Sequence, residues 1–320
     1  MIVSTTDFIR VLHPEPHAGR GRQLLLAHPE IRALAGPDPT SVVWVVLLVA
    51  LQGALALLVA GRPWYIWLAC AYIVGATIDH ALWVLIHECS HNLIVRWRTG
   101  NRLIALLANL PMVIPAALSF CKYHLLHHRH MGDLDLDAGV PGPLESRLVG
   151  RSGMMKAAWI AGFVLVMGIV RPRRLAVRLL DGWTVANFVV QTAAMVTLVW
   201  FTGLRPLWYL LASSVFAIGL HPLGARWIQE HFALRDDQET YSYYGPLNKL
   251  SFNVGYHNEH HDIVTVPWSR LPAVRRAAPE FYDHLASYSS WTRLLLRFLT
   301  DRSLTLFKYV VRGGAAQAAR

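Results

Sequence analysis

The apolar residues of this chain are gathered into uninterrupted blocks instead of being spaced as helical stripes. Residues 41–60 contain one glutamine and no charge, and in residues 64–86 the interruptions are Asp79 and His80. Two shorter blocks cover residues 185–201 and 206–221. Because a helix needs about 20 apolar residues to cross a bilayer, we expect four transmembrane helices. The alternative, buried helices in a large soluble core, rarely needs uncharged runs of this length.

The basic residues indicate how these blocks are oriented. The chain has a net charge of +10, and 28 of its 30 Lys and Arg lie outside the two short connections, residues 61–63 and 202–205. These connections contain only Arg62 and Arg205. Since Lys and Arg favour the cytoplasmic side of spans, we expect two hairpins with both termini and the middle of the chain in the cytoplasm. A membrane explains the basic charge, so no nucleic-acid partner is expected.

Two further apolar stretches are less suited to crossing. Residues 103–120 contain Pro111 and Pro115, and residues 157–170 are short. If the first stretch crossed, histidines before and after it would lie on opposite faces, so we expect both to be re-entrant or interfacial. The prediction is an all-α integral membrane protein with a cytoplasmic N-terminal arm, residues 1–40, and a single membrane domain, residues 41–320. Its histidine-rich cytoplasmic cap would comprise residues 87–184 and 222–320.

Histidines are clustered in three short motifs. The chain has 16 histidines, and eight of them form one HxxxH and two HxxHH patterns. Spacings of three and four residues place side chains on one face of a helix, so each motif can direct several imidazoles to one place. The eight are His87, His91, His124, His127, His128, His257, His260 and His261. Isolated histidines, namely His13, His17, His28 and His284, are expected to be surface or capping residues.

The number of imidazoles indicates metal chemistry. Imidazole suits Zn, Cu, Fe or Ni, and a structural zinc site usually has four ligands, often thiolates. At least eight imidazoles and no cysteine pair favour two metals with open positions, which suits O2 activation by iron. The motifs begin where spans end, so such a site can take a lipid chain from the bilayer and electrons from a soluble donor. Removing hydrogen from unactivated CH2 groups needs a strong metal-based oxidant.

The three motifs resemble the membrane fatty acid desaturase/hydroxylase superfamily and, more closely, the sphingolipid Δ4-desaturases. The resemblance covers nearly the whole chain. The segments that carry it are PHAGRGRQLLLAHPEIRALAGPDP at 16–39, HECSHN at 87–92, YHLLHHRHMGDLDLD at 123–137 and the long run from ETYSYYG to YSSW at 239–291.

This resemblance implies a non-haem di-iron centre that uses O2 to introduce a trans double bond at C4–C5 of the sphinganine backbone of a ceramide. It assigns the eight motif histidines as ligands and calls for a ninth from HPLGARWIQEH, where we favour His231 over His221. His80 and His221 are further possible ligands. Because the chain has no HPGG haem motif, electrons must come from a separate chain, such as cytochrome b5 or a ferredoxin with its reductase. The membrane would be the endoplasmic reticulum in a eukaryote and the inner membrane in a bacterium.

Some expectations concern the surroundings of the ligands. Glu88, Asn258 and Glu259 are candidates for orienting imidazoles, and Arg226 stands where the family pattern calls for another histidine. The acyl chain is expected to contact residues among Trp83, Trp159, Trp183, Trp227 and Tyr256.

Three other functions remain open at this stage. A sphingolipid C4-hydroxylase or an acyl-lipid desaturase would use the same centre. A membrane metal transporter is disfavoured, because transport sites place ionisable groups near the bilayer midplane and only Asp79 and His80 are predicted within a span.

Overall fold

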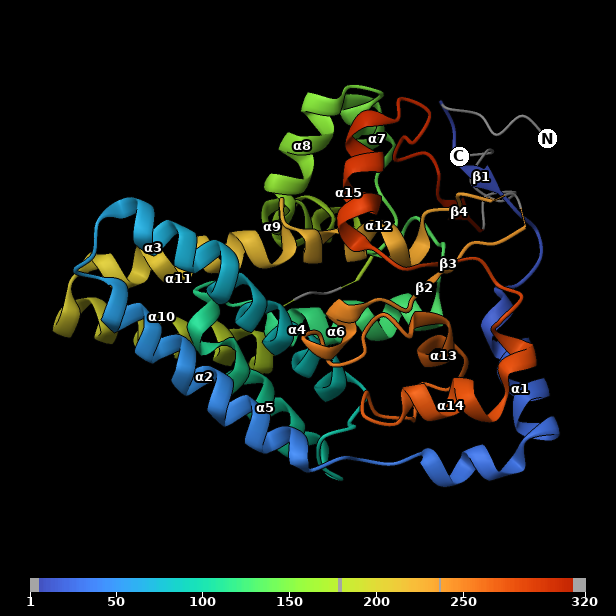
Figure 1. Cartoon of the computed structure of the whole chain (residues 1–320), viewed down its shortest axis with the longest axis horizontal. Coiled ribbons are helices and arrows are strands. Elements are labelled where there is room, and N and C mark those ends of the chain that lie inside the picture. The colour runs from blue at the N-terminus through green and yellow to red at the C-terminus, as the bar shows by residue number, and fades with distance from the viewer. Residues whose placement is uncertain (1–5, 178–179, 236, 313–320) are drawn as a thin grey trace.

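Long helices form one side of the molecule, and short helices and loops form the other (Figure 1). The computed structural model describes residues 6–177, 180–235 and 237–312. The helices are α1 (Pro16–Ala27), α2 (Thr40–Val59), α3 (Trp64–Cys70), α4 (Ala76–Ser90), α5 (Arg98–Asn109), α6 (Ala117–Arg129), α7 (Pro143–Val149), α8 (Gly153–Ala161), α9 (Phe163–Leu165), α10 (Gly182–Thr202), α11 (Leu204–Ile218), α12 (Arg226–His231), α13 (His257–Asp262), α14 (Leu271–Ala277) and α15 (Trp291–Thr300).

Within the described part of the chain, four helical segments are long and apolar enough to cross a membrane, as predicted. They are Thr40–Val59, Trp64–Ser90, Gly182–Thr202 and Leu204–His231. The second joins α3 to α4 through a π-helical turn, Ala71–Gly75. The count rises to six if each of two bent helix pairs is a span.

The second and fourth candidate segments are longer than the predicted spans. The second continues past residue 86 to Ser90. In the fourth, α11 ends at Ile218, and the 3-10 turn Pro222–Ala225 leads into α12, which ends at His231. His87 and His231 are buried against other histidines, so their polar side chains do not mark the start of a solvent-exposed loop. His87 therefore lies on the long helix α4, and His231 lies on the short helix α12 that follows α11.

A sharp bend brings α6 back beside α4. The segments Arg98–Met112 and Ala117–Arg129 meet at 118°, in the stretch where the sequence predicted a re-entrant or interfacial turn. Asn109 stabilises the bend, because its side-chain amide donates to the carbonyl of Ile114 and accepts from the backbone N–H groups of Ala116 and Ala117. The second bent pair, Gly153–Ala161 and Phe163–Arg174, meets at 62°.

Asp79 joins three long helices. Its carboxyl oxygens accept hydrogen bonds from Gln52 of α2, at 3.0 Å, and from Ser214 of α11, at 2.9 Å. The helices approach closely here, since a Cβ at Gly75 would lie 2.1 Å from the hydroxyl oxygen of Ser213. A buried polar group is costly unless it is hydrogen-bonded. Asp79 thus has a structural role that accounts for its burial inside a candidate membrane span.

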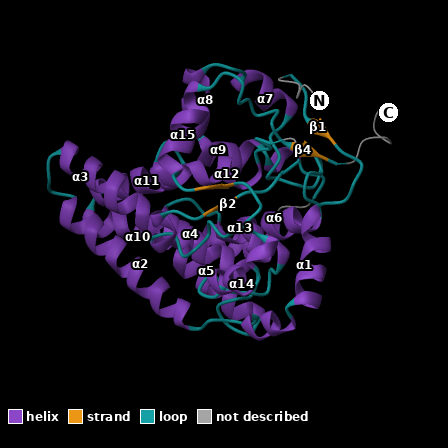
Figure 2. Ribbon diagram, turned by 45° about the vertical axis from the view of Figure 1, so that its right-hand side comes forward, coloured by secondary structure: helices purple, strands orange, loops and turns teal. Residues whose placement is uncertain are grey.

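Four strands of two residues each depart from the all-α prediction. β1 (Ile9–Arg10) pairs in parallel with β4 (Val310–Val311), and β2 (Ser242–Tyr243) pairs in parallel with β3 (Ser287–Tyr288). They are too short to produce a period-2 pattern in the sequence. The first pair ties the N-terminal segment to the C-terminal end of the fold, and the second lies beside α13 (Figure 2).

Candidate metal centre

Histidine side chains from α4, α6, α12 and α13, together with His91 directly after α4, converge in two neighbouring groups. Within each group, one nitrogen per histidine lies within 4.8 Å of those of the others. The first group is His87, His91, His124, His128 and His260, and the second is His127, His231 and His261. The rings of His128 and His261 stack with their centroids 4.2 Å apart, so the two groups are in direct contact.

In the first group, imidazole nitrogens face one another instead of other polar groups. The Nε2 atom of His124 lies 2.8 Å from that of His91 and 2.9 Å from that of His128. The Nε2 atom of His260 lies 3.2 Å from that of His128. Lone pairs that converge in this way are suited to sharing one cation, because neutral imidazole binds metals through Nε2 or Nδ1.

The second group is built around His231. Its Nε2 atom lies 3.0 Å from Nε2 of His127 and 3.0 Å from Nε2 of His257. His257 therefore adjoins this group, although it is not one of the three histidines that satisfy the common distance. The structure thus brings together all nine histidines predicted as ligands.

The two further candidates lie elsewhere. His80 donates from Nδ1 to the carbonyl of Ala217 at 3.0 Å. His221 accepts at Nδ1 from the backbone N–H of Leu223 and packs against Tyr72. Neither belongs to the two groups.

Buried carboxylates contact the outer nitrogens of several imidazoles. The Nδ1 atom of His127 donates to Asp137 at 2.9 Å. The Nδ1 atoms of His87 and His257 lie 3.4 Å from Glu88 and 3.7 Å from Glu230, respectively. Of these three contacts, the one between His127 and Asp137 is a hydrogen bond, and such a partner fixes the ring orientation and the tautomer of a metal ligand.

Asp137 was missed by sequence reasoning. Its pKa would be raised by burial, but the His127 imidazole and the backbone N–H groups of Gly132 and Gly139 hold it below the usual range. Asp137 is therefore ionised. The only signal for it was its place in the aspartate-rich end of HMGDLDLD.

Of the three residues predicted to orient imidazoles, Asn258 and Glu259 contact other groups. Glu259 accepts from the hydroxyls of Ser242 and Tyr244 at 2.8 and 2.6 Å, and burial raises its pKa to about 7. Asn258 bonds to Arg20 and Ser242. These two residues hold α13 in place, and for them the prediction was wrong.

The protonation of the histidines and their free ring nitrogens are suited to binding metal ions. Burial, followed by repulsion from neighbouring imidazoles, lowers the pKa of His257, His260 and His261 well below the usual value. These rings are therefore neutral, which is the metal-binding form. The buried Nε2 atom of His261 has no hydrogen-bond partner among residues 6–177, 180–235 and 237–312. A buried nitrogen without a partner is costly unless it serves as a ligand.

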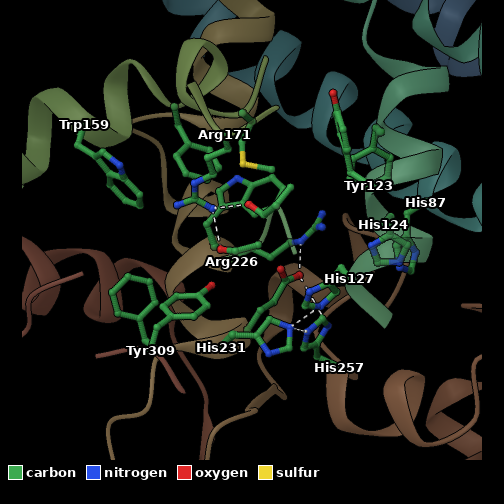
Figure 3. Close-up of a pocket in the computed structure, with 18 residues that line it drawn as sticks. His87, Tyr123, His124, His127, Trp159, Arg171, Arg226, His231, His257 and Tyr309 are labelled. Carbon is green, nitrogen blue, oxygen red and sulfur yellow. Dashed lines mark hydrogen bonds and ion pairs between the residues drawn. The ribbon is translucent and has the colours of Figure 1, made fainter. Parts of the chain in front are cut away.

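A cavity adjoins both groups (Figure 3). His87, His124, His127, His231 and His257 line one side, and Trp159 lies on the opposite side. A second, more apolar cavity shares part of this lining, namely Phe120, Tyr123, Met167, Arg226 and Trp227, and extends along Trp83, Ile114, Val164 and Ile218. Of the aromatic residues expected beside an acyl chain, Trp83, Trp159 and Trp227 line one or both of these cavities, whereas Trp183 and Tyr256 line neither.

Comparisons with known proteins decide the family. The model of the fatty acid desaturase family matches residues 62–292, and that of the sphingolipid Δ4-desaturase (DES) family matches residues 4–40. The chain is 42% identical to sphingolipid delta(4)-desaturase DES1 of Drosophila melanogaster, with 97% of each chain covered. It is 39% identical to sphingolipid delta(4)-desaturase DES1-like of Oryza sativa subsp. japonica, with 97% of this chain and 94% of the relative covered.

The chain belongs to the sphingolipid Δ4-desaturase family, within the fatty acid desaturases. This desaturase is therefore an oxidoreductase. It is also 40% identical, over 97% of its length and 96% of the relative, to sphingolipid delta(4)-desaturase/C4-monooxygenase DES2 of Homo sapiens.

Arg226, where the sequence resemblance called for a histidine, lies inside the desaturase. Arg226 is buried, forms an ion pair with Glu230, and lies with its guanidinium 4.8 Å from the ring centroid of Trp227. It lines both cavities where they meet. Arg226 therefore places a positive charge beside the second histidine group instead of a further imidazole.

The surface role expected for His17 was wrong. His17 is only 2% exposed, and its ring centroid lies 4.8 Å from that of His261. A single histidine in a polar segment gives no sign of this, because its partners are far away in the sequence. His13 and His284 are exposed, as expected.

Proposed function

We propose that this desaturase uses two histidine-bound iron ions and O2 to introduce a trans double bond between C4 and C5 of the sphinganine chain of a dihydroceramide-type lipid. The observation that carries the proposal is the pair of histidine groups on the wall of a cavity that continues into an apolar one. The sphingolipid names of the relatives support the substrate class.

Each histidine group would hold one iron ion. His87, His91, His124, His128 and His260 would ligate the first, and His127, His231 and His261, with His257 beside them, the second. Asp137 keeps the Nδ1 proton of His127 in place, which leaves Nε2 free to bind. Iron would supply the oxidant, formed with O2, that removes hydrogen from unactivated CH2 groups. One hydrogen leaves each of two adjacent carbons, and O2 takes up these hydrogens together with electrons and protons from the donor and leaves as water.

The two cavities suggest how the lipid is oriented. C4 is bonded to the carbon that carries the C3 hydroxyl, and the C2 amide is one bond further, so the polar end must lie beside the irons. Arg226 and Glu230 offer a donor and an acceptor at this place. The tail beyond C5 would follow the apolar lining of the second cavity, including Trp83 and Ile218. Aromatic walls on both sides keep water from the reacting carbons.

The membrane orientation follows from the distribution of charge. With the N-terminus, middle and C-terminus in the cytoplasm, the histidine groups face the compartment that holds soluble electron carriers. Cytochrome b5 or a ferredoxin, each with its reductase, would supply the electrons. The two hairpin connections at Arg62 and Arg205 would lie on the opposite face. The membrane is the endoplasmic reticulum in a eukaryote or the inner membrane in a bacterium.

C4 hydroxylation is the second candidate function. Its support is the C4-monooxygenase activity named for DES2 of Homo sapiens and of Bos taurus, which are 40% and 41% identical to this chain. Both reactions begin with removal of a hydrogen atom beside the same centre, so the histidine groups suit either.

Lipid mass spectrometry separates the two reactions. The chain is expressed in cells that lack Δ4-unsaturated sphingolipids, and the cells are fed dihydroceramide. We expect a product two mass units lighter, with its double bond located at C4–C5 by fragmentation. A product sixteen mass units heavier would show that the reaction is hydroxylation and not desaturation. If neither product forms, although the chain is present in the membrane and a compatible donor is co-expressed, the substrate proposal is overturned.

A further inference from the structure

The N-terminal helix α1 reaches the metal centre through two of its side chains. His17 donates from Nδ1 to Asp262 at 2.8 Å, and Arg20 donates from Nε to the other carboxylate oxygen at 2.7 Å. The Asp262 side chain is 0% exposed. Asp262 directly follows His261 of the second histidine group. Side chains of α1 therefore form hydrogen bonds with the residue next to a proposed ligand.

The contact between α1 and α13 depends on a glycine. A Cβ at Gly21 would lie 2.2 Å from the backbone oxygen of Asp262. Since real Cβ atoms do not approach backbone so closely, a larger residue would push α1 away from α13. The N-terminus of α1 is itself fixed by Glu15, whose carboxylate accepts from the backbone N–H groups of His17 and Ala18. His17 is therefore held at a defined distance from α13.

A second route leads from α1 to His231. The Nε2 atom of His17 lies 2.9 Å from the hydroxyl of Thr240, and that hydroxyl lies 3.5 Å from Nδ1 of His231. When the neutral His17 ring donates from Nδ1 to Asp262, its Nε2 accepts, and the Thr240 hydroxyl donates to it. The Thr240 oxygen then accepts from Nδ1–H of His231. This leaves Nε2 of His231 without a proton and directed at His127 and His257.

We infer that His17 and Thr240 are positioning residues for the second histidine group: they set the tautomer of His231 through the Thr240 hydroxyl, and His17 sets the position of His261 through Asp262 and through the contact between the two rings. This inference rests on the proposed metal function and gives residues 16–27 a role in it. These residues lie within the segment matched by the sphingolipid Δ4-desaturase model, residues 4–40. The first histidine group has no such link to His17 through Thr240 or Asp262 in the described residues.

The test measures iron per chain in purified, full-length protein. In Thr240→Val the side-chain shape is kept but the hydroxyl is lost, and in His17→Ala both links are lost. We expect iron to fall from about two to about one per chain in both variants, because outer partners of ligands contribute about 10–100-fold to metal affinity. Desaturation should fall at least ~10-fold.

Matched controls separate positioning from folding. Thr240→Ser keeps the hydroxyl and should restore both iron ions. His28→Ala, at the other end of α1, removes a ring whose bonds are to Glu30 and Glu280 at the surface, and should also keep both. A merely structural role for α1 would reduce the yield or Tm without changing iron per chain. Thr240→Val with full iron content would overturn the inference, whereas a wild-type chain without iron would overturn the proposed metal function itself.

Discussion

Replacing His260 by Ala is expected to abolish desaturation while the chain remains in the membrane. His260 is 2% exposed and has its Nε2 atom directed at His128 in the first histidine group. Loss of this ligand removes one of the five imidazoles that would hold the first iron. Since outer partners of ligands alone cost 10–100-fold, we expect more than a ~100-fold fall in product formation. The fall is measured by analysing the lipid products of membranes that contain equal amounts of the wild-type chain and of the His260→Ala variant.

His284→Ala is the matched control for this prediction. His284 is exposed and its Nδ1 atom contacts the carbonyl of Glu280, away from both histidine groups. Its loss should leave activity unchanged. Wild-type turnover in the His260 variant would remove His260 from the set of ligands.

The second large effect is expected from blocking the junction of the two cavities. Met167 is half-buried and lines both of them, so an indole in its place would occupy the path of the lipid chain. Excluding even one methylene from a binding pocket costs about 10–200-fold. We therefore expect kcat/KM of Met167→Trp for a long-chain substrate to fall at least ~100-fold, with iron per chain unchanged.

Ile169→Trp controls for the bulk of the new side chain. Ile169 lies in the same π-helical turn, Val166–Val170, but is 44% exposed and lines neither cavity. The Ile169→Trp variant should keep the wild-type kcat/KM for the long-chain substrate. If Met167→Trp also turned over long-chain lipid normally, the chain would have to reach the histidines by another route.

Much of the candidate metal centre was predictable because helical spacing determines which side chains share a face. His124 and His128 are four residues apart and fall in one group. The division into two groups was not predictable. Consecutive residues on a helix point about 100° apart, so His260 and His261 serve different groups, but which neighbour each meets depends on how α13 is placed against α6.

The remaining misses concern partners that are far apart in the chain. His17 and Asp262 are separated by 245 residues, and no local pattern connects them. In the same way, α4 extends to Ser90 because its polar end is buried by other elements. Hydrophobicity alone places a boundary where polar residues begin, and this helix continues beyond that point.

The most direct test of the account is the metal content of the purified chain together with its dependence on iron. We expect about two iron ions per chain, held by neutral imidazoles. Chelation should abolish desaturation, and Fe(II), but not Zn(II), should restore it. A chain that contains stable zinc and keeps its activity after iron chelation would contradict the di-iron mechanism.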